Sequence, residues 1–138
     1  MREHPWLEQL GEQGYRLTEA RRAVARTMAG SDRALTPIEV YDEARAAYSA
    51  LGLVTVYRTL EALEGLGLIQ RVHHPDGCQA FITAPGGHQH LLLCEQCGRA
   101  TRFEGDNLDG LIRSIGRKTG YRITEHWLQL FGLCSDCK

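Results

Sequence analysis

The sequence predicts an α+β fold in two parts, a winged helix-turn-helix domain followed by a small α/β domain. Three observations lead to this prediction. Apolar residues recur at helical spacing up to about residue 67, and strand-like segments around a Pro75-Asp76-Gly77 turn follow them. A β-β-α-β pattern then occupies the rest of the chain. Two Cys-x-x-Cys pairs in that second part indicate a tie between its first and last strands.

Four helices are expected in the first part. A short apolar stripe predicts the first helix, and its members are Trp6, Leu7 and Leu10. Thr18 is placed to cap the second helix, which should end near Gly30. Thr36-Pro37-Ile38-Glu39 has the residues of a capping box, so a third helix should begin there, with helical spacing of Ile38, Tyr41, Ala44 and Tyr48. The fourth helix should begin around Thr55, and the side chains of Val56, Leu60 and Leu63 should face the core.

The hydrophobic period changes after the fourth helix. Segments 68–73 and 79–82 are strand-like and are expected to form a β-hairpin. Small helices followed by a hairpin outline a winged helix, in which the helix before the hairpin is the recognition helix of a helix-turn-helix. We therefore expect residues 1–84 to form a winged-helix DNA-binding domain.

The second part begins after a hinge at about residues 84–88, which contain Ala84-Pro85-Gly86-Gly87. Strands are expected at 90–93 and 100–103, a helix at 106–119 and a last strand at 122–131. A unit of this size is too small to bury its apolar face alone. Residues 85–138 are therefore expected to form a metal-binding dimerisation domain of a homodimer.

Composition limits the function without naming it. The chain has 138 residues, of which 43% are hydrophobic and 24% charged, as in a globular protein. Its net charge of −1 provides no general basic field, so any DNA contact must rest on locally placed arginines. The sequence has no apolar run that could span a bilayer and no signal-peptide stretch. We expect a cytoplasmic protein with no membrane partner.

Four of the five cysteines form two Cys-x-x-Cys pairs, Cys94/Cys97 and Cys134/Cys137. Disulfides are disfavoured in the cytoplasm. Two thiolates three residues apart can bind one edge of a tetrahedral zinc ion, and the second pair completes the shell. One pair alone would also suit a redox dithiol, whereas two pairs in one small domain favour structural Zn²⁺. The alternatives are metal-free reduced thiols and oxidation-prone dithiols.

Three histidines and an aspartate form a candidate second metal site. His88 and His90 lie two residues apart in a strand-like stretch, so their imidazoles could share one ion. His126 lies in the predicted last strand, and Asp109 lies in the first turn or so of the predicted helix, where the helix dipole also favours a carboxylate. Taken alone, His126 is better explained as a half-buried strand residue and Asp109 as a helix-terminal charge.

The segment Gly52-Leu53-Val54-Thr55-Val56-Tyr57-Arg58-Thr59-Leu60 resembles the recognition-helix signature of the ferric uptake regulator (Fur) superfamily. Cys-x-x-Cys-Gly after His-x-His, and a terminal Gly-x-Cys-x-x-Cys, fall in the order of that family, so the resemblance covers residues 14–137. It implies a metal-dependent repressor of metal-uptake genes, a homodimer on an A·T-rich palindromic operator in double-stranded DNA. It also implies structural zinc on the four paired cysteines and a regulatory metal on His88, His90, Asp109 and His126.

The types of ligand atom in the predicted regulatory site indicate which metal it would bind. Iron regulators of this family often have Asp and Glu as the second and third ligands, where this chain has His90 and Asp109. Three nitrogens and one carboxylate favour Zn²⁺ and a zinc-uptake-regulator type, with an Fe²⁺- or Mn²⁺-responsive repressor as the alternative. A peroxide sensor is a further alternative, although its site normally contains more carboxylate.

Many relatives have another sensory site between the two domains. The matching positions here are poor ligands, so we expect that site to be absent or rebuilt; they are Ala34, Ile82, Gln89, Leu91 and Arg102. Cys78 with His73 or His74 could form a substitute. A turn thiol and wing histidines that contact phosphate or solvent explain these three residues more simply.

DNA contact is expected on the exposed face of the fourth helix. Arg58 lies nearly opposite the apolar stripe, with Thr55 and Tyr57 beside it. Arginine can bind guanine with two hydrogen bonds, and tyrosine can contact a thymine methyl group or a phosphate. The resemblance adds Arg16 at a minor groove and Arg21 near the DNA backbone. We expect no catalytic residues and no small organic substrate, since a hydrolytic zinc enzyme needs a general base and a cleft that the sequence does not show.

Overall fold

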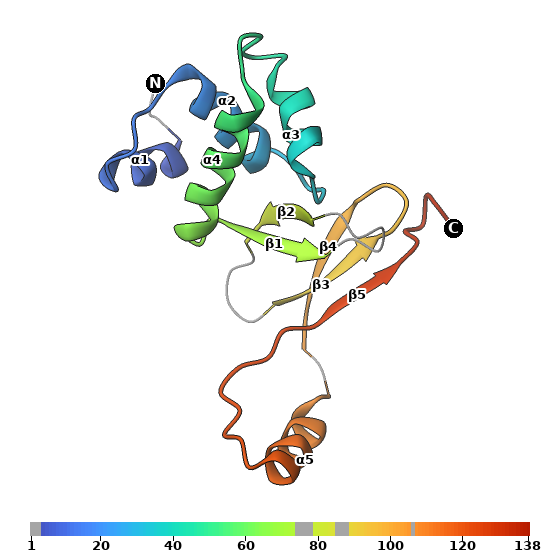
Figure 1. The fold of residues 1–138 in the computed structure, drawn as a ribbon. Helices are drawn as coiled ribbons and strands as arrows, with labels where there is room; N and C mark the ends of the chain where they lie inside the picture. Colours follow the sequence, from blue (N-terminus) through green and yellow to red (C-terminus); the bar gives the residue numbers. More distant parts are fainter. Residues whose placement is uncertain (1–3, 74–78, 85–88, 106) are drawn as a thin grey trace.

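The computed structural model describes residues 4–73, 79–84, 89–105 and 107–138. Helices α1 to α4 gather at one end, the wing β1–β2 lies beside them, and the sheet of β3, β4 and β5 follows (Figure 1). Within the described residues, no helix combines the length and apolar character needed to cross a membrane. The arrangement confirms the predicted α+β fold class.

Local sequence signals set the bounds of the first four helices, α1 Pro5–Glu12, α2 Glu19–Ala29, α3 Pro37–Ala44 and α4 Leu53–Gly65. The side chain of Thr18 caps α2 by accepting the N–H of Arg21 at 3.2 Å. Thr36 and Glu39 make both hydrogen bonds of the predicted capping box. Helix α4 begins at Leu53, two residues before the predicted start, and its N-cap Gly52 has no side chain to contribute.

The main hydrophobic core lies among these helices and is built from residues between 6 and 81. On α4 the predicted stripe is correct, since Val56, Leu60 and Leu63 are buried. On α3 the buried residues are Val40 and Ala44, whereas Ile38 is half exposed. Ile38 precedes Val40 by two residues, or about 200° around a helix, so its side chain faces away from the core. The helical spacing predicted for this segment is present, and Ile38 lies off its buried face.

The wing consists of β1 Ile69–His73 and β2 Gln79–Thr83, paired antiparallel. Arg71 holds it against α4, because its guanidinium donates to both carboxylate oxygens of Glu64, at 3.0 and 3.1 Å. The same guanidinium bonds the side chain of Gln79 and lies 5.0 Å from the ring centre of Phe81. The wing is thereby fixed to the end of the helix that precedes it.

The C-terminal sheet has the strand order β4-β3-β5, with β3 Gln89–Cys94, β4 Ala100–Glu104 and β5 Gln129–Gly132. Strand β3 is antiparallel to β4 and parallel to β5. Helix α5 Asp109–Thr119 connects β4 to β5 and stands apart from the sheet in Figure 1. None of its described residues is buried within the chain. The order β-β-α-β agrees with the sequence prediction.

The last strand is shorter than predicted. Residues 122–128 belong to no strand, so the prediction of a strand over 122–131 was wrong for most of its length. Pairing with β3 begins only where Gln129 lies opposite Leu91. The preceding residues instead span the distance from the separate helix α5 back to the sheet. Two of their apolar residues, Ile123 and Trp127, are correspondingly exposed.

A second apolar core joins the two predicted domains. It contains Ala34, Val72, Ala80, Ile82, Leu91 and Leu93. The first four precede the predicted hinge and the last two follow it, so a single apolar cluster contains residues from both predicted domains. The division into domains of residues 1–84 and 85–138 remains a prediction, and side-chain packing alone does not mark it.

Candidate metal centres

The parallel pairing of β3 and β5 brings the two Cys-x-x-Cys pairs together. Cys94 ends β3 and lies opposite Gly132 at the end of β5. The N–H of Glu95 donates to the carbonyl of Gly132 at 2.8 Å, which aligns the turns that follow the two strands. Parallel neighbours end at the same edge of a sheet, so Cys97 and the Cys134/Cys137 pair reach a common point.

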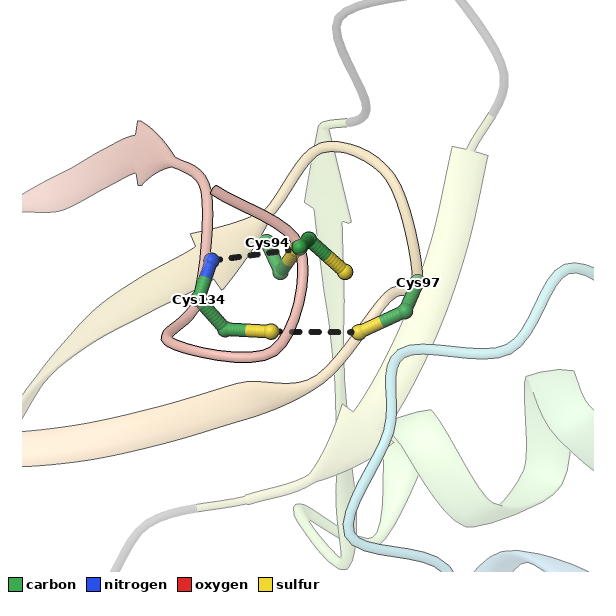
Figure 2. A group of neighbouring side chains, drawn as sticks. Cys94, Cys97 and Cys134 are labelled. Carbon is green, nitrogen blue, oxygen red and sulfur yellow. Dashed lines mark hydrogen bonds between the residues drawn. The ribbon is translucent and has the colours of Figure 1, made fainter.

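The four thiols form a site of the right size for a tetrahedral metal ion. The Sγ atoms of Cys94, Cys97, Cys134 and Cys137 all lie within 4.8 Å of one another. Those of Cys97 and Cys134 are 3.7 Å apart (Figure 2). A tetrahedral zinc ion with Zn–S bonds of about 2.3 Å separates its sulfur ligands by about 3.8 Å. An ion pair of 2.8 Å between Arg99 and Asp136 also links the two turns.

The thiols differ in how readily they lose a proton. The N–H of Cys134 donates to Sγ of Cys94 at 3.4 Å (Figure 2) and, with the backbone groups of Cys97 and Gln96, lowers the pKa of Cys94 to about 6. Hydrogen bonding with the Cys134 thiol, together with burial, raises the pKa of Cys137 to about 12. At neutral pH Cys94 is therefore already a thiolate, whereas Cys137 still holds the proton that a metal ion must displace.

We expect metal affinity at this cluster to fall as the solution is acidified. Between about pH 7 and pH 9 Cys94 is ionised, whereas Cys137 must release its proton when metal binds. Each proton released lowers the apparent affinity about tenfold for each pH unit of acidification. Competition with a chromophoric chelator at several pH values, with proton release measured in weak buffer, checks this. A pH-independent affinity without proton release would contradict it.

Two predicted ligands of the second site lie together. The rings of His90 and His126 have centroids 5.2 Å apart. His90 lies on β3 and is fully buried, and its Nδ1 accepts the N–H of Leu128 at 3.1 Å. The rings of Phe103 and Trp127 lie 5.5 and 6.2 Å from it. His126 is half-buried in the segment that leads to β5.

The other two predicted ligands are not gathered with this pair. Asp109 is the first residue of α5 and is exposed. Among the described residues, the four cysteines are the only group of three or more potential ligands within 4.8 Å of one another, so Asp109 does not complete a set with the imidazoles. His88 lies outside the described residues. The four-residue site stays a prediction that the histidine pair supports.

The positions matched to a sensory site between the domains are occupied by core packing. Ala34, Ile82 and Leu91 are all buried in the second apolar core. Arg102 donates to the carbonyl of Thr83 across the same junction, and the side chain of Gln89 is outside the described part. These observations support the prediction that this chain lacks that site. The suggested substitute is not tested, because Cys78 and His74 lie outside the described residues; His73 is exposed on β1.

The predicted DNA-contacting residues lie on α4, on α2 and just before α2. Arg58 and Tyr57 are exposed on α4, and Thr55 is half-buried one turn earlier. Arg16 is also exposed, and its carbonyl accepts a hydrogen bond of 2.7 Å from Arg21. Their contacts with DNA remain predictions, and the exposure of Arg58 opposite the buried stripe is what the sequence led us to expect.

Sequence reasoning missed the residues that connect the cysteine turn to the helices. Arg33 donates to the carbonyl of Cys97 at 2.7 Å, across 64 positions of sequence. Gly98 has a positive φ of 79° and lies against the carbonyl of Ala34. A glycine directly after Cys-x-x-Cys was the one available signal, since such a residue often marks a left-handed turn.

The chain matches one known protein family over most of its length. A model of the ferric uptake regulator family matches residues 12–131, which is most of the chain. The chain belongs to the ferric uptake regulator family. Family members are transcriptional regulators that bind DNA and act as dimers, and they are not enzymes. The predicted family is thereby confirmed.

Individual relatives differ in the signal that their names record. The ferric uptake regulation protein of Campylobacter jejuni is 30% identical over 93% of this chain and 83% of its own length. That of Neisseria meningitidis is 35% identical, over 64% of this chain, and the match spans 61% of the length of that relative. A solved zinc-bound manganese uptake regulator is 32% identical, with a TM-score of 0.71 over 93% of this chain and 98% of its own. A peroxide-responsive repressor of Staphylococcus saprophyticus and a peroxide operon regulator of Bacillus subtilis also match.

Proposed function

We propose that this protein is a zinc-responsive repressor of metal-uptake genes, a homodimer whose DNA binding is controlled at His88, His90, Asp109 and His126. The observation that carries the proposal is the buried His90 ring beside His126, with centroids 5.2 Å apart. Two imidazoles on one tetrahedral zinc ion have ring centres roughly 5 Å apart, because the Zn–N distance is about 2.0–2.1 Å. The pair therefore has a spacing suited to sharing an ion.

The choice of zinc for this site rests on donor chemistry. Relatives carry names that refer to iron, peroxide and manganese, so their names do not select one signal. Three imidazole nitrogens and one carboxylate suit tetrahedral Zn²⁺, whereas Fe²⁺ and Mn²⁺ favour more oxygen ligands and a higher coordination number. An iron- or manganese-responsive repressor is the alternative that the same experiment tests.

The hydrogen bond from Leu128 to His90 ties the histidine pair to the last strand. A neutral imidazole that accepts at Nδ1 carries its proton on Nε2, so neither nitrogen then offers a lone pair to an ion. His90 can act as a ligand only after this bond is given up. Residues 126–128 would then shift beside the start of β5. Binding of an ion at His90 would in this way be coupled to the position of residues 126–128, which connect α5 to the sheet.

We assign structural Zn²⁺ to the four-cysteine cluster. Four thiolates at near-tetrahedral spacing form a closed shell, and a zinc ion bound there supplies cross-linking rather than chemistry. The protein contributes a preformed Cys94 thiolate and two turns that the Arg99–Asp136 ion pair holds side by side. The ends of β3 and β5 are the elements that such an ion would join.

For DNA recognition we propose that α4 enters a major groove. Arg58 would contact base edges, with Tyr57 and Thr55 beside it, and Arg16 and Arg21 would contact the minor groove and backbone. The bonds from Arg71 to Glu64 and Gln79 keep the wing in place relative to α4. In a homodimer, two copies of α4 would read half-sites of an A·T-rich palindrome about 34–36 Å apart, or a multiple of that distance.

Substitution of His126 by alanine tests the proposed regulatory site. Wild-type protein is titrated onto a pool of A·T-rich palindromic duplexes in the presence of Zn²⁺, Fe²⁺ or Mn²⁺. We expect binding to require Zn²⁺, and His126→Ala to need at least about 100-fold more of it, since changes even to the outer partners of a metal site cost 10–100-fold. The affinity is measured by gel shift or fluorescence anisotropy.

His4→Asn is the matched control, because it removes an imidazole at the N-cap of α1 while keeping an acceptor for the N–H of Trp6, and it leaves the His90–His126 pair in place. Its metal requirement should equal that of the wild type. If His126→Ala responds to the same metal at the same concentration as the wild type, the regulatory site is wrongly placed. If Fe²⁺ or Mn²⁺ alone activates binding, the assignment of zinc is wrong while the repressor class stands.

A further inference from the structure

The segment that leads into α3 is held between the four-cysteine turn and the wing. On one side the N–H of Ala34 donates to the carbonyl of Gly98 at 2.8 Å, and the N–H of Ala100 donates to the carbonyl of Asp32 at 3.1 Å. On the other side Leu35 exchanges two backbone hydrogen bonds with Phe81, of 2.9 and 2.8 Å. Residues 32–35 therefore act as a short strand between two elements that are distant in sequence.

Arg33 adds a side-chain bond at the same place. Its Nη1 donates to the carbonyl of Cys97 at 2.7 Å, a length typical of a charge-assisted bond. Cys97 carries one of the four thiols, so Arg33 binds the backbone of the turn that would hold the ion. In Figure 2 the segment that leads to α3, drawn in pale blue, passes beside this turn.

Gly98 permits this close approach. Its φ of 79° is a conformation that other residues rarely adopt, and a Cβ built on it would lie 3.2 Å from the carbonyl oxygen of Ala34. A side chain there would both strain the turn and push the segment away. Ala34 is 95% buried in the second apolar core. A shift of the segment away from Gly98 would therefore disturb this packing.

We propose that Arg33 and Gly98 are positioning residues that dock the helix-turn-helix onto the four-cysteine turn. The metal site then orients α3 and α4 as well as joining β3 to β5. The path is short: the turn holds residues 32–35, Thr36 caps α3 directly after them, and α3 packs on α4. Only the DNA readout of this proposal rests on the proposed function.

The test compares Arg33→Met with Arg45→Met. Both changes remove one positive charge beside α3, but the guanidinium of Arg45 lies 5.0 Å from the ring centre of Tyr41, and the residue belongs neither to the four-cysteine turn nor to the proposed DNA contacts. In metal-loaded Arg33→Met we expect the amide of Ala34 to exchange its hydrogen at least about tenfold faster than in the wild type, and DNA affinity to fall about tenfold. Arg45→Met should show neither change, and both variants should keep their metal.

Two further measurements separate positioning from general stability. Arg33→Lys retains a charged donor and should recover part of the DNA affinity, whereas the unfolding temperature should be the same for the Met and Lys variants. Chelation of the metal in wild-type protein should expose the Ala34 amide as Arg33→Met does, while amides of α2 stay protected. The proposal is overturned if the Ala34 amide stays protected in metal-free wild-type protein and in Arg33→Met, or if Arg45→Met behaves like Arg33→Met. If wild-type protein fails to bind DNA, the proposed function fails, and hydrogen exchange still decides the docking.

Discussion

Cys94→Ser is expected to remove the ion from the four-cysteine cluster and to unfold the C-terminal sheet. Cys94 is the most buried of the four, it ends the central strand β3, and its thiol is ionised at neutral pH. Structural zinc sites contribute roughly 10–16 kcal/mol to folding in small zinc-binding peptides. A whole domain is typically stable by only about 5–15 kcal/mol. A sheet of three short strands with an exposed helix has no other source of stabilisation of comparable size.

The winged helix should survive in the same variant, because its main core is complete within residues 6–81. Hydrogen exchange should therefore show protected amides in α2 and α4 and unprotected ones in β3 and β5. Trp6 packs on the main core and Trp127 lies near His90, so single-tryptophan versions report on the two parts separately. Cys78→Ser is the control and should keep its metal. A Cys94→Ser protein with an intact sheet and no metal would refute the structural role of the cluster.

Much of the fold could be predicted because local signals decide it. The capping box at Thr36 fixed the start of α3, and the stripe of Val56, Leu60 and Leu63 fixed the inward face of α4. The spacing of the cysteine pairs predicted a cluster that the structure does assemble. In each case the residues that determine the feature are close in sequence, or their chemistry leaves few alternatives.

The features that could not be predicted depend on distant parts of the chain. Apolar residues at 122–128 look like a strand, because periodicity does not show that α5 stands away from the sheet and must be reached by an extended connection. The hydrogen bond from Arg33 to the carbonyl of Cys97 spans 64 positions, and no local sequence pattern predicts it. His90 and His126 could be paired only through the family resemblance, since their spacing in sequence carries no geometric information.

Apolar packing at the junction of the two parts narrows where a sensory ion could act. Ala34, Ile82 and Leu91 fill the space in which the resemblance would place another metal site, and none of them can bind an ion. Because these positions offer no ligand, we expect no metal-dependent control of the DNA-binding helices at that point. The histidine pair beside β5 and the cysteine turn beside α3 remain the candidate metal sites among the described residues that could influence α4.

Ile115→Glu is expected to dissociate the proposed homodimer. Helix α5 buries none of its described residues within the chain, and Leu111 and Ile115 are 56% and 42% exposed on one face. Leu130 and Phe131 add exposed apolar surface on β5, which is an edge strand of the sheet. Such surface on a small unit requires a partner, and a second copy supplies the same face. A buried carboxylate without a partner would be strongly unfavourable there.

DNA binding should fall together with the dimer. Two linked heads on two half-sites gain roughly 10²–10⁴-fold in affinity over one head, so the monomer should lose about that much. Sedimentation equilibrium and anisotropy titrations on the same samples measure both effects. Arg113→Gln makes the same change in charge on the opposite side of the helix from Leu111 and Ile115 and should stay dimeric. If Ile115→Glu remains a dimer at low micromolar concentration, α5 is not the main contact, and the edge of β5 must carry the association instead.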